Sequence, residues 1–194
     1  MQKKVKKDYQ LAKEVYATGN TDAMYLAGLI ADDEKMTKED LQTWVKQAVS
    51  NNISEYTVPW VATGSKHGFE LATEWINSPK EHIATAGWAT LSNIVTLKPD
   101  TELDTKQLTQ LLERAAKDIR TAPNRVRYTM NGFVIAVGAY SVPLSDKAIA
   151  TAKKIGTVTV NVDGTACKVP DATEYIIKSQ ARGSLGKKKK TVKC

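Results

Sequence analysis

The chain has 194 residues, of which 42% are apolar, and a formal charge of +7. This length allows one domain with a continuous core and is short for two. The longest uncharged apolar stretch, residues 132–142, is much shorter than the roughly 20 residues that cross a bilayer, and the lysine-rich start has no apolar signal core. We therefore expect a cytoplasmic protein without membrane contact.

Helical spacing of apolar residues, at intervals of three and four, runs through most of the chain. Gly19-Asn20-Thr21 and Thr37-Lys38-Glu39-Asp40 provide a helix stop and two N-caps. Ser78-Pro79 and Ala122-Pro123 place proline where a helix can begin. The pattern predicts ten short helices, near residues 5–18, 22–32, 38–49, 54–63, 66–77, 80–97, 104–121, 124–140, 144–155 and 171–181.

One segment near the C-terminus departs from this helical pattern. Thr157–Val162 and Thr165–Val169 alternate with period two on either side of Asp163-Gly164, a dipeptide typical of tight hairpin turns. We therefore expect a small β-hairpin at about 157–169 in an otherwise all-α chain.

Gly28, Gly87 and Gly132 each lie inside a predicted helix, directly before a large apolar residue. Glycine within a helix costs about 1 kcal/mol relative to alanine, so its recurrence favours close helix-to-helix contact, although coincidence among 11 glycines is the alternative. Short paired helices admit either a compact bundle or a stacked array, and this weak repeat favours a HEAT-like α-α superhelix, a curved solenoid.

Positive charge is concentrated at the C-terminus. Residues 181–194 contain six lysines and arginines and no acid, and without them the formal charge falls from +7 to +1. We interpret residues 1–181 as the helical-repeat domain and residues 182–194 as a basic tail, which is either simply solvated or bound to an anionic partner. Cys167 and Cys194 have no metal-site spacing, so we expect reduced thiols, no metal and no cofactor.

Glu55-Tyr56-Thr57-Val58-Pro59, followed by His67, Glu70-Leu71 and Trp75-Ile76-Asn77-Ser78, resembles the alkylpurine DNA glycosylases of the DNA alkylation repair family. The resemblance covers roughly residues 8–150. It implies a curved helical solenoid whose concave face holds duplex DNA, and excision of cationic N3- or N7-alkylated purines. Members place a carboxylate near the sugar and tryptophans beside the cationic base, where indole faces stabilise positive charge.

Several positions depart from the family pattern. The resemblance places Glu55 at the catalytic aspartate, which retains the charge but adds a methylene. Asn51 stands where the family has its first tryptophan, Gly132 where it has the second, and Thr85 where it has a DNA-facing arginine. Loss of several transition-state contacts can abolish excision, since each 1.4 kcal/mol is tenfold in rate.

Other residues are candidates for DNA contact. We expect Lys80 and His82, and Arg125, Arg127 and Tyr128, to present positive charge and free amides at helix starts. Trp60 is the candidate replacement for a missing tryptophan, whereas Trp44 and Trp75 are expected in the core. The full set of candidate nucleic-acid-binding residues is Asn51, Asn52, Trp60, Lys80, His82, Thr85, Arg125, Arg127, Tyr128, Lys187, Lys188, Lys189 and Lys190.

Three functions follow from these observations. The first is a monomeric protein, nucleoid-associated when bound to DNA, that recognises duplex DNA, including damaged or branched duplexes, on a concave basic face. The second is an active N-glycosylase that uses Glu55. The third is a HEAT-like protein-interaction scaffold whose basic ends aid solubility.

Overall fold

The computed structural model describes residues 5–162 and 168–193, and all the regular secondary structure in these ranges is helical. The chain forms two compact units. Unit 1 comprises Met1–Ile94 and Thr191–Cys194, and unit 2 comprises Val95–Lys190. Cys167 and Cys194, which we expect to be reduced thiols, lie outside the described residues.

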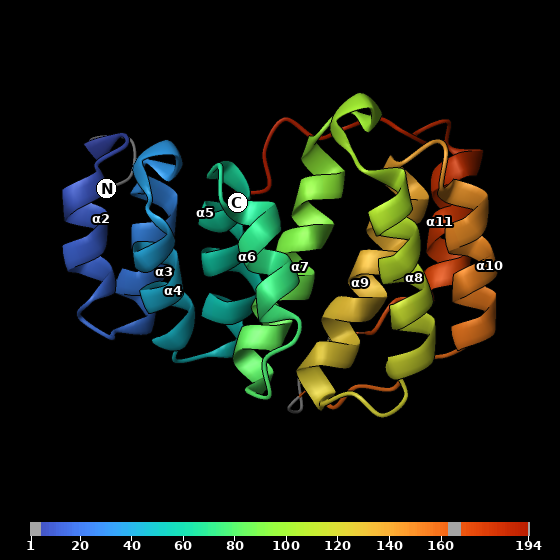
Figure 1. The fold of residues 1–194 in the computed structure, drawn as a ribbon, viewed down its shortest axis with the longest axis horizontal. Helices are drawn as coiled ribbons and strands as arrows, with labels where there is room; N and C mark the ends of the chain where they lie inside the picture. The colour runs from blue at the N-terminus through green and yellow to red at the C-terminus, as the bar shows by residue number, and fades with distance from the viewer. Residues whose placement is uncertain (1–4, 163–167, 194) are drawn as a thin grey trace. The chain divides into compact units, whose positions relative to one another are not determined.

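Unit 1 is built from short helices that pack against their chain neighbours, as in the pairs α2 with α3 and α5 with α6 (Figure 1). The last three residues of α7 belong to unit 2. The elements are α2 (Tyr9–Tyr16), α3 (Thr21–Ile30), the 3-10 turn η1 (Asp33–Lys35), α4 (Lys38–Lys46), the π-helical turn η2 (Ile53–Thr57), α5 (Val58–Gly64), α6 (Gly68–Trp75) and α7 (Glu81–Leu97).

The predicted caps define the starts of these helices. The Asn20 side chain accepts hydrogen bonds from the amides of Asp22 and Ala23 at the start of α3. Thr37 and Asp40 form a complete capping box on α4. Each cap satisfies amides that an isolated helix end leaves unpaired, so the sequence signal has a direct structural cause.

Aromatic side chains make specific contacts in the core of unit 1. The rings of Tyr16 and Trp44 stack with centroids 4.0 Å apart, and the Tyr16 hydroxyl donates to the Trp44 carbonyl at 2.7 Å. Trp75 is buried and its indole N–H donates to Gln42 at 3.1 Å. The predicted core role of Trp44 and Trp75 is confirmed.

Two of the three helical glycines lie at close contacts. A Cβ atom on Gly28 would lie 2.6 Å from the Thr57 methyl group, and one on Gly87 would lie 2.8 Å from the backbone nitrogen of Ile76. A Cβ on Gly132 would have no neighbour within 4 Å. Close packing therefore explains glycine at positions 28 and 87 but not at 132.

Unit 2 contains four longer helices and a 3-10 turn (Figure 1). One face of α8 is apolar through Leu108, Leu111 and Leu112, and α9 packs against α8, α10 and α11. The elements are η3 (Asp100–Glu102), α8 (Thr105–Asp118), α9 (Asn124–Tyr140), α10 (Ser145–Ile155) and α11 (Ala172–Ala181).

The predicted β-hairpin at 157–169 is not found in the described residues. Residues 157–162 and 168–169 contain no strand, while the turn at Asp163-Gly164 lies outside the described residues. The Asn124 amide donates to the Asn161 carbonyl and accepts from the Asn161 amide, both at 2.8 Å. One side chain thus satisfies the backbone groups that a partner strand would pair with, and an isolated two-stranded hairpin is only marginally stable.

The segment predicted as a basic tail is hydrogen-bonded to helices. Within unit 2, the Gly186 amide donates to Ala139, and the Lys189 amide donates to Thr96, both at 3.0 Å. The Lys188 ammonium binds the Val95 carbonyl and the Asp100 carboxylate. Within unit 1, Lys193 pairs with the buried Asp33 at 2.7 Å. These contacts give the C-terminal segment a defined path.

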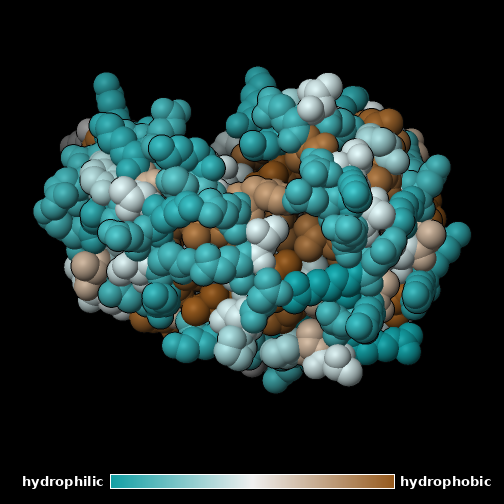
Figure 2. All heavy atoms as spheres, viewed as in Figure 1, coloured by the Kyte–Doolittle hydropathy of each residue, from teal (hydrophilic) through white to brown (hydrophobic). Residues whose placement is uncertain are grey.

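Polar side chains cover most of the face shown in Figure 2, with apolar residues visible as smaller patches between them. In the part of the chain that the structure describes, none of the helices has both the length and the apolar character needed to span a bilayer.

Candidate nucleic-acid interface

Glu55, the candidate catalytic residue, lies on the π-helical turn Ile53–Thr57. Pro59 has no amide hydrogen, and in an α-helix its ring would clash with the carbonyl of residue 55. The wider turn relieves this conflict, because the Val58 amide donates to Ile53, five residues earlier. Such turns occur frequently at functional sites. The local sequence thus gives Glu55 an irregular backbone position.

The side chain of Glu55 is buried, with 6% of its surface exposed. Its neighbours Ser54 and Thr57 are also buried, and Thr57 is packed against Gly28 of α3. Access to DNA is therefore limited for this carboxylate. Among the described residues, no group of three or more histidine, cysteine or acidic side chains is placed to hold a metal ion.

An aromatic cluster follows Glu55 on the next turns. The Trp60 ring meets Tyr25 edge-on at 5.4 Å and Tyr56 at 6.2 Å between centroids. Trp60 is 3% exposed, whereas Tyr56 is 42% exposed. Tyr25 and Tyr56 were not among the predicted site residues, although Tyr56 lies one turn before Trp60 in the sequence. The exposed ring beside Glu55 is therefore a tyrosine.

The remaining candidates of unit 1 divide into exposed and buried groups. Asn51, Asn52 and Lys80 are exposed. Thr85 is 1% exposed, and its hydroxyl has no hydrogen-bond partner among the described residues. Trp60 and Thr85 therefore present almost no surface to a ligand.

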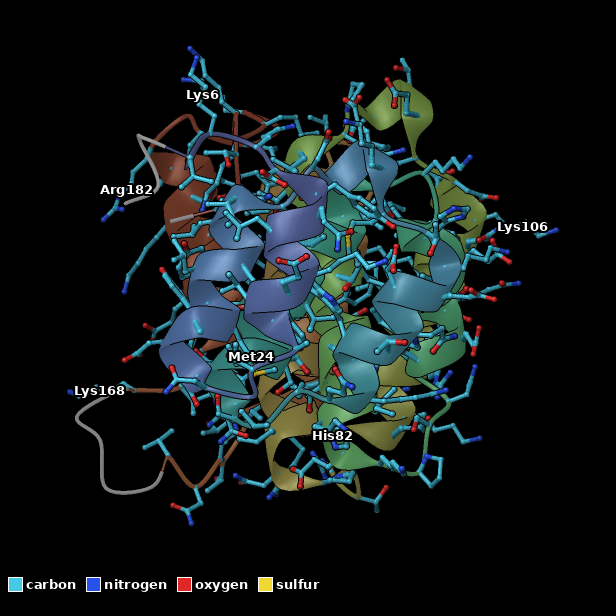
Figure 3. All side chains as sticks on the ribbon, turned by 90° about the vertical axis from the view of Figure 1, so that its left-hand side faces the viewer. Lys6, Met24, His82, Lys106, Lys168 and Arg182 are labelled. Carbon is cyan, nitrogen blue, oxygen red and sulfur yellow. The ribbon has the colours of Figure 1, made fainter. Side chains whose placement is uncertain are left out.

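His82 lies in the first turn of α7 and is half-buried (Figure 3). Burial lowers the pKa of His82, and the nearby Lys80 lowers it further, against the opposing effect of a hydrogen bond with the Lys46 backbone. A lowered pKa favours the neutral form of His82, which adds no charge for a phosphate.

The start of α9 gathers the predicted cations of unit 2. The Arg125 guanidinium lies 4.6 Å from the centre of the Tyr128 ring, a cation-π contact. Arg127 donates weakly to Asn124 at 3.5 Å, and its buried Nε has no partner among the described residues. With Arg120, Arg127 lines a cavity of about 300 Å³. Two guanidinium groups thus border one cavity.

The C-terminal lysines differ in their surroundings. Lys187, Lys189 and Lys190 are exposed, and the first two line a second cavity in unit 2. The Lys188 side chain instead points into its ion pair with Asp100, with 17% of its surface exposed. Only part of the lysine run is therefore available to a partner.

The two units differ strongly in charge. Unit 1 contains 11 lysines and no arginine against 12 acids, a formal charge of −1. Unit 2 contains 17 lysines and arginines against nine acids, a formal charge of +8. The excess positive charge therefore lies in unit 2, both in its C-terminal segment and in the rest of the unit.

Comparison with known proteins links this chain to one family, to two relatives and to a solved structure. The model of the DNA alkylation repair enzyme family matches residues 1–176. Uncharacterized proteins of Listeria innocua and Listeria monocytogenes are each 36% identical over 181 residues, which cover 92% of this chain and 77% of each relative. A solved structure, described as a new family related to the HEAT-like repeat DNA glycosylases with affinity for branched DNA, matches with a TM-score of 0.92 and 36% identity, over 100% of this chain and 82% of that one. The chain therefore belongs to the DNA alkylation repair enzyme family.

Proposed function

We propose that this protein binds duplex DNA, including damaged or branched duplexes, through the basic surface of unit 2. The formal charge of +8 on unit 2 is the observation that carries the proposal. Lysine and arginine side chains that neutralise phosphates release counterions, which supplies most of the sequence-independent affinity of such proteins. The affinity of the solved relative for branched DNA supports the same class of ligand. The contact of DNA with a concave face of the protein stays a prediction.

The start of α9 is the part of this surface best suited to a phosphate. Arg125 and Tyr128 are half-exposed and hold each other through their cation-π contact. The first amides of a helix have no intrahelical acceptor, and the helix dipole favours an anion there. Charge, amides and a fixed guanidinium therefore coincide at one place.

We further propose that the protein does not excise bases by the tryptophan-dependent mechanism that its resemblance implies. All four tryptophans are at most 3% exposed, so none offers a ring face to a cationic base. Thr85 and Gly132 supply neither the charge nor the aromatic surface of the residues they replace.

A second function, excision through Glu55, is favoured by one observation: a carboxylate at an irregular helical turn next to the half-exposed ring of Tyr56. Methylated DNA incubated with the wild type and with Glu55→Gln separates the two possibilities. We expect no released alkylpurine from either protein. Release by the wild type that Glu55→Gln abolishes would establish the second function.

DNA binding is tested by fluorescence anisotropy with a labelled duplex and a labelled four-way junction at increasing salt. We expect the logarithm of affinity to fall linearly with the logarithm of salt concentration, with a slope of roughly −0.9 for each phosphate contact. Arg125→Ala should remove about one phosphate contact and make the slope shallower by roughly 0.9. The matched control is Lys66→Ala, an exposed lysine of unit 1, which should leave the slope unchanged.

Absence of salt-dependent binding to both DNAs would contradict the proposal. It would instead favour a HEAT-like scaffold for protein partners.

A further inference from the structure

A cavity of about 340 Å³ in unit 2 lies between α11, the end of α9 and the C-terminal segment. Its lining combines four cations, two tyrosines and two serines, and includes no acidic residue. The lining residues are Tyr140, Tyr175, Lys178, Ser179, Arg182, Ser184, Lys187 and Lys189.

The positive charge of this cavity is only partly neutralised. Lys178 pairs with Glu174 at 3.3 Å, and both side chains are about two-thirds exposed, so solvent screens the pair strongly. Lys189 lies 5.9 Å from the centre of the Tyr140 ring, a contact that leaves its charge intact. Arg182 extends from the end of α11 towards solvent (Figure 3). An anion entering the cavity thus meets three to four positive groups.

The backbone that carries Lys187 and Lys189 is held in place before any ligand binds. Residues 187–189 contain no helix, and their side chains alternate in direction, so that Lys188 meets Asp100 while its two neighbours face the cavity. The Gly186 amide is bonded to Ala139, and the Lys189 amide to Thr96. A preformed arrangement lowers the entropy cost of binding.

The cavity also carries hydroxyl groups and an exposed aromatic ring. The Ser179 and Ser184 hydroxyls lie 3.0 Å apart, and the Ser184 hydroxyl also donates to the Ser179 carbonyl. The Tyr175 ring is 48% exposed. Cations beside an aromatic face are the arrangement by which proteins hold single strands, with the phosphate on the cations and the base stacked on the ring.

We propose that this cavity binds a phosphodiester of an unpaired DNA strand and that the adjacent base stacks on Tyr175. The proposal rests on the DNA-binding function proposed above and adds a separate contact for single-stranded ends or branches. A base inside a duplex is stacked on both faces and is not available to a tyrosine, so the ring selects unpaired nucleotides. The cavity volume suits one nucleotide and is far too small for a duplex.

The test compares a labelled blunt duplex with the same duplex carrying a five-thymidine overhang, by anisotropy with the full chain. We expect the wild type to bind the overhang duplex about fivefold or more tightly than the blunt one, since stacking of one base has about this effect. Tyr175→Ala should remove this preference, and Tyr175→Phe should restore it. The matched control is Ile177→Ala, because Ile177 is 46% exposed on the same helix and does not line the cavity.

The cations are tested with the double variant Lys187→Ala/Lys189→Ala. It should lose the overhang preference and show a shallower salt dependence on the overhang duplex. Its control is Lys153→Ala/Lys154→Ala, which removes the same charge from exposed positions of α10 in the same unit. Thermal melting by circular dichroism verifies that each variant is folded.

The two proposals fail in different ways. Binding of the blunt duplex without an overhang preference, or a preference that survives Tyr175→Ala, would overturn the cavity assignment and leave duplex binding intact. If the blunt duplex does not bind, the function proposed above fails. Binding of free oligothymidylate then tests the cavity proposal independently of duplex binding. Binding that requires Tyr175 supports the proposal, and absence of binding overturns it.

Discussion

Tryptophan occurs only in unit 1 and arginine only in unit 2. All four tryptophans belong to unit 1 and are at most 3% exposed. All five arginines belong to unit 2, whose formal charge is +8 against −1 for unit 1. Unit 1 also contains Glu55, the candidate catalytic residue. Unit 1 thus buries its tryptophans and Glu55, whereas unit 2 carries the surplus positive charge on which the proposed DNA binding rests.

The charges of unit 1 nearly balance, and several of them form ion pairs within that unit. Lys13 pairs with Asp40, Lys38 with Glu70, and Lys193 with Asp33. In unit 2 the 17 cations outnumber the nine acids, so at least eight of these cations exceed the acids of the unit.

Trp60→Ala should have the largest effect, and on stability alone. Removing this buried ring, which packs against Tyr25 and Tyr56, should lower the free energy of unfolding by about 3–5 kcal/mol. Urea denaturation measures the loss, and anisotropy at low temperature measures DNA affinity of the folded variant. If folded Trp60→Ala were stable but lost DNA affinity, Trp60 would belong to the interface and the contrast between the units would fail.

Removing cations from unit 2 should weaken DNA binding much more than removing them from unit 1. Arg125→Ala/Arg127→Ala/Lys190→Ala, three cations that do not line the cavity beside Tyr175, should reduce affinity for duplex DNA by roughly 10- to 100-fold at low salt, because about three phosphate contacts are lost. The control is Lys35→Ala/Lys46→Ala/Lys66→Ala, three exposed lysines of unit 1. Equal loss in both triple variants would show that the partition of charge has no functional role.

The glycine contacts separate a packed position from an open one. Gly87→Ala should lower the free energy of unfolding by about 1–3 kcal/mol, because its Cβ would meet backbone atoms of Ile76 and Ala72 below 3 Å. Gly132→Ala, also within a helix, should raise it by about 0.5–1 kcal/mol, since its Cβ meets nothing within 4 Å. Thermal unfolding of both variants measures the difference, and a stabilising Gly87→Ala would refute the packing.

Asp40 should make unit 1 sensitive to acid. Burial raises the pKa of Asp40, but hydrogen bonds from Lys13, Thr37 and Tyr9 outweigh this and lower it to about 2. A folded-state pKa below the ordinary value of about 3.9 contributes stability above pH 4 that is lost as the pH falls towards 2. Asp40→Asn should therefore cost about 1–2 kcal/mol at pH 7 and much less at pH 2. Urea denaturation across this range measures it, and a cost independent of pH would contradict the assignment.

The helices could be predicted because their signals are local. The N-caps Asn20 and Thr37, the capping partner Asp40 and the three-four spacing of Leu108, Leu111 and Leu112 act within one or two turns of the chain. The hairpin prediction was wrong for the described residues because its competitor, the Asn124 side chain, lies 37 residues away from Asn161. A pattern within 157–169 contains no information about that contact.

The sequence by itself determined the helical class, the family and the excess of positive charge, because composition, periodicity and motif order do not depend on packing. The exposure of single residues depended on the tertiary structure, which buried Trp60 and Thr85, turned Lys188 towards Asp100, and brought Tyr175 beside Lys187 and Lys189. The physical reason is that exposure depends on neighbouring helices and segments distant in the chain. Each residue's own sequence neighbours do not specify those contacts.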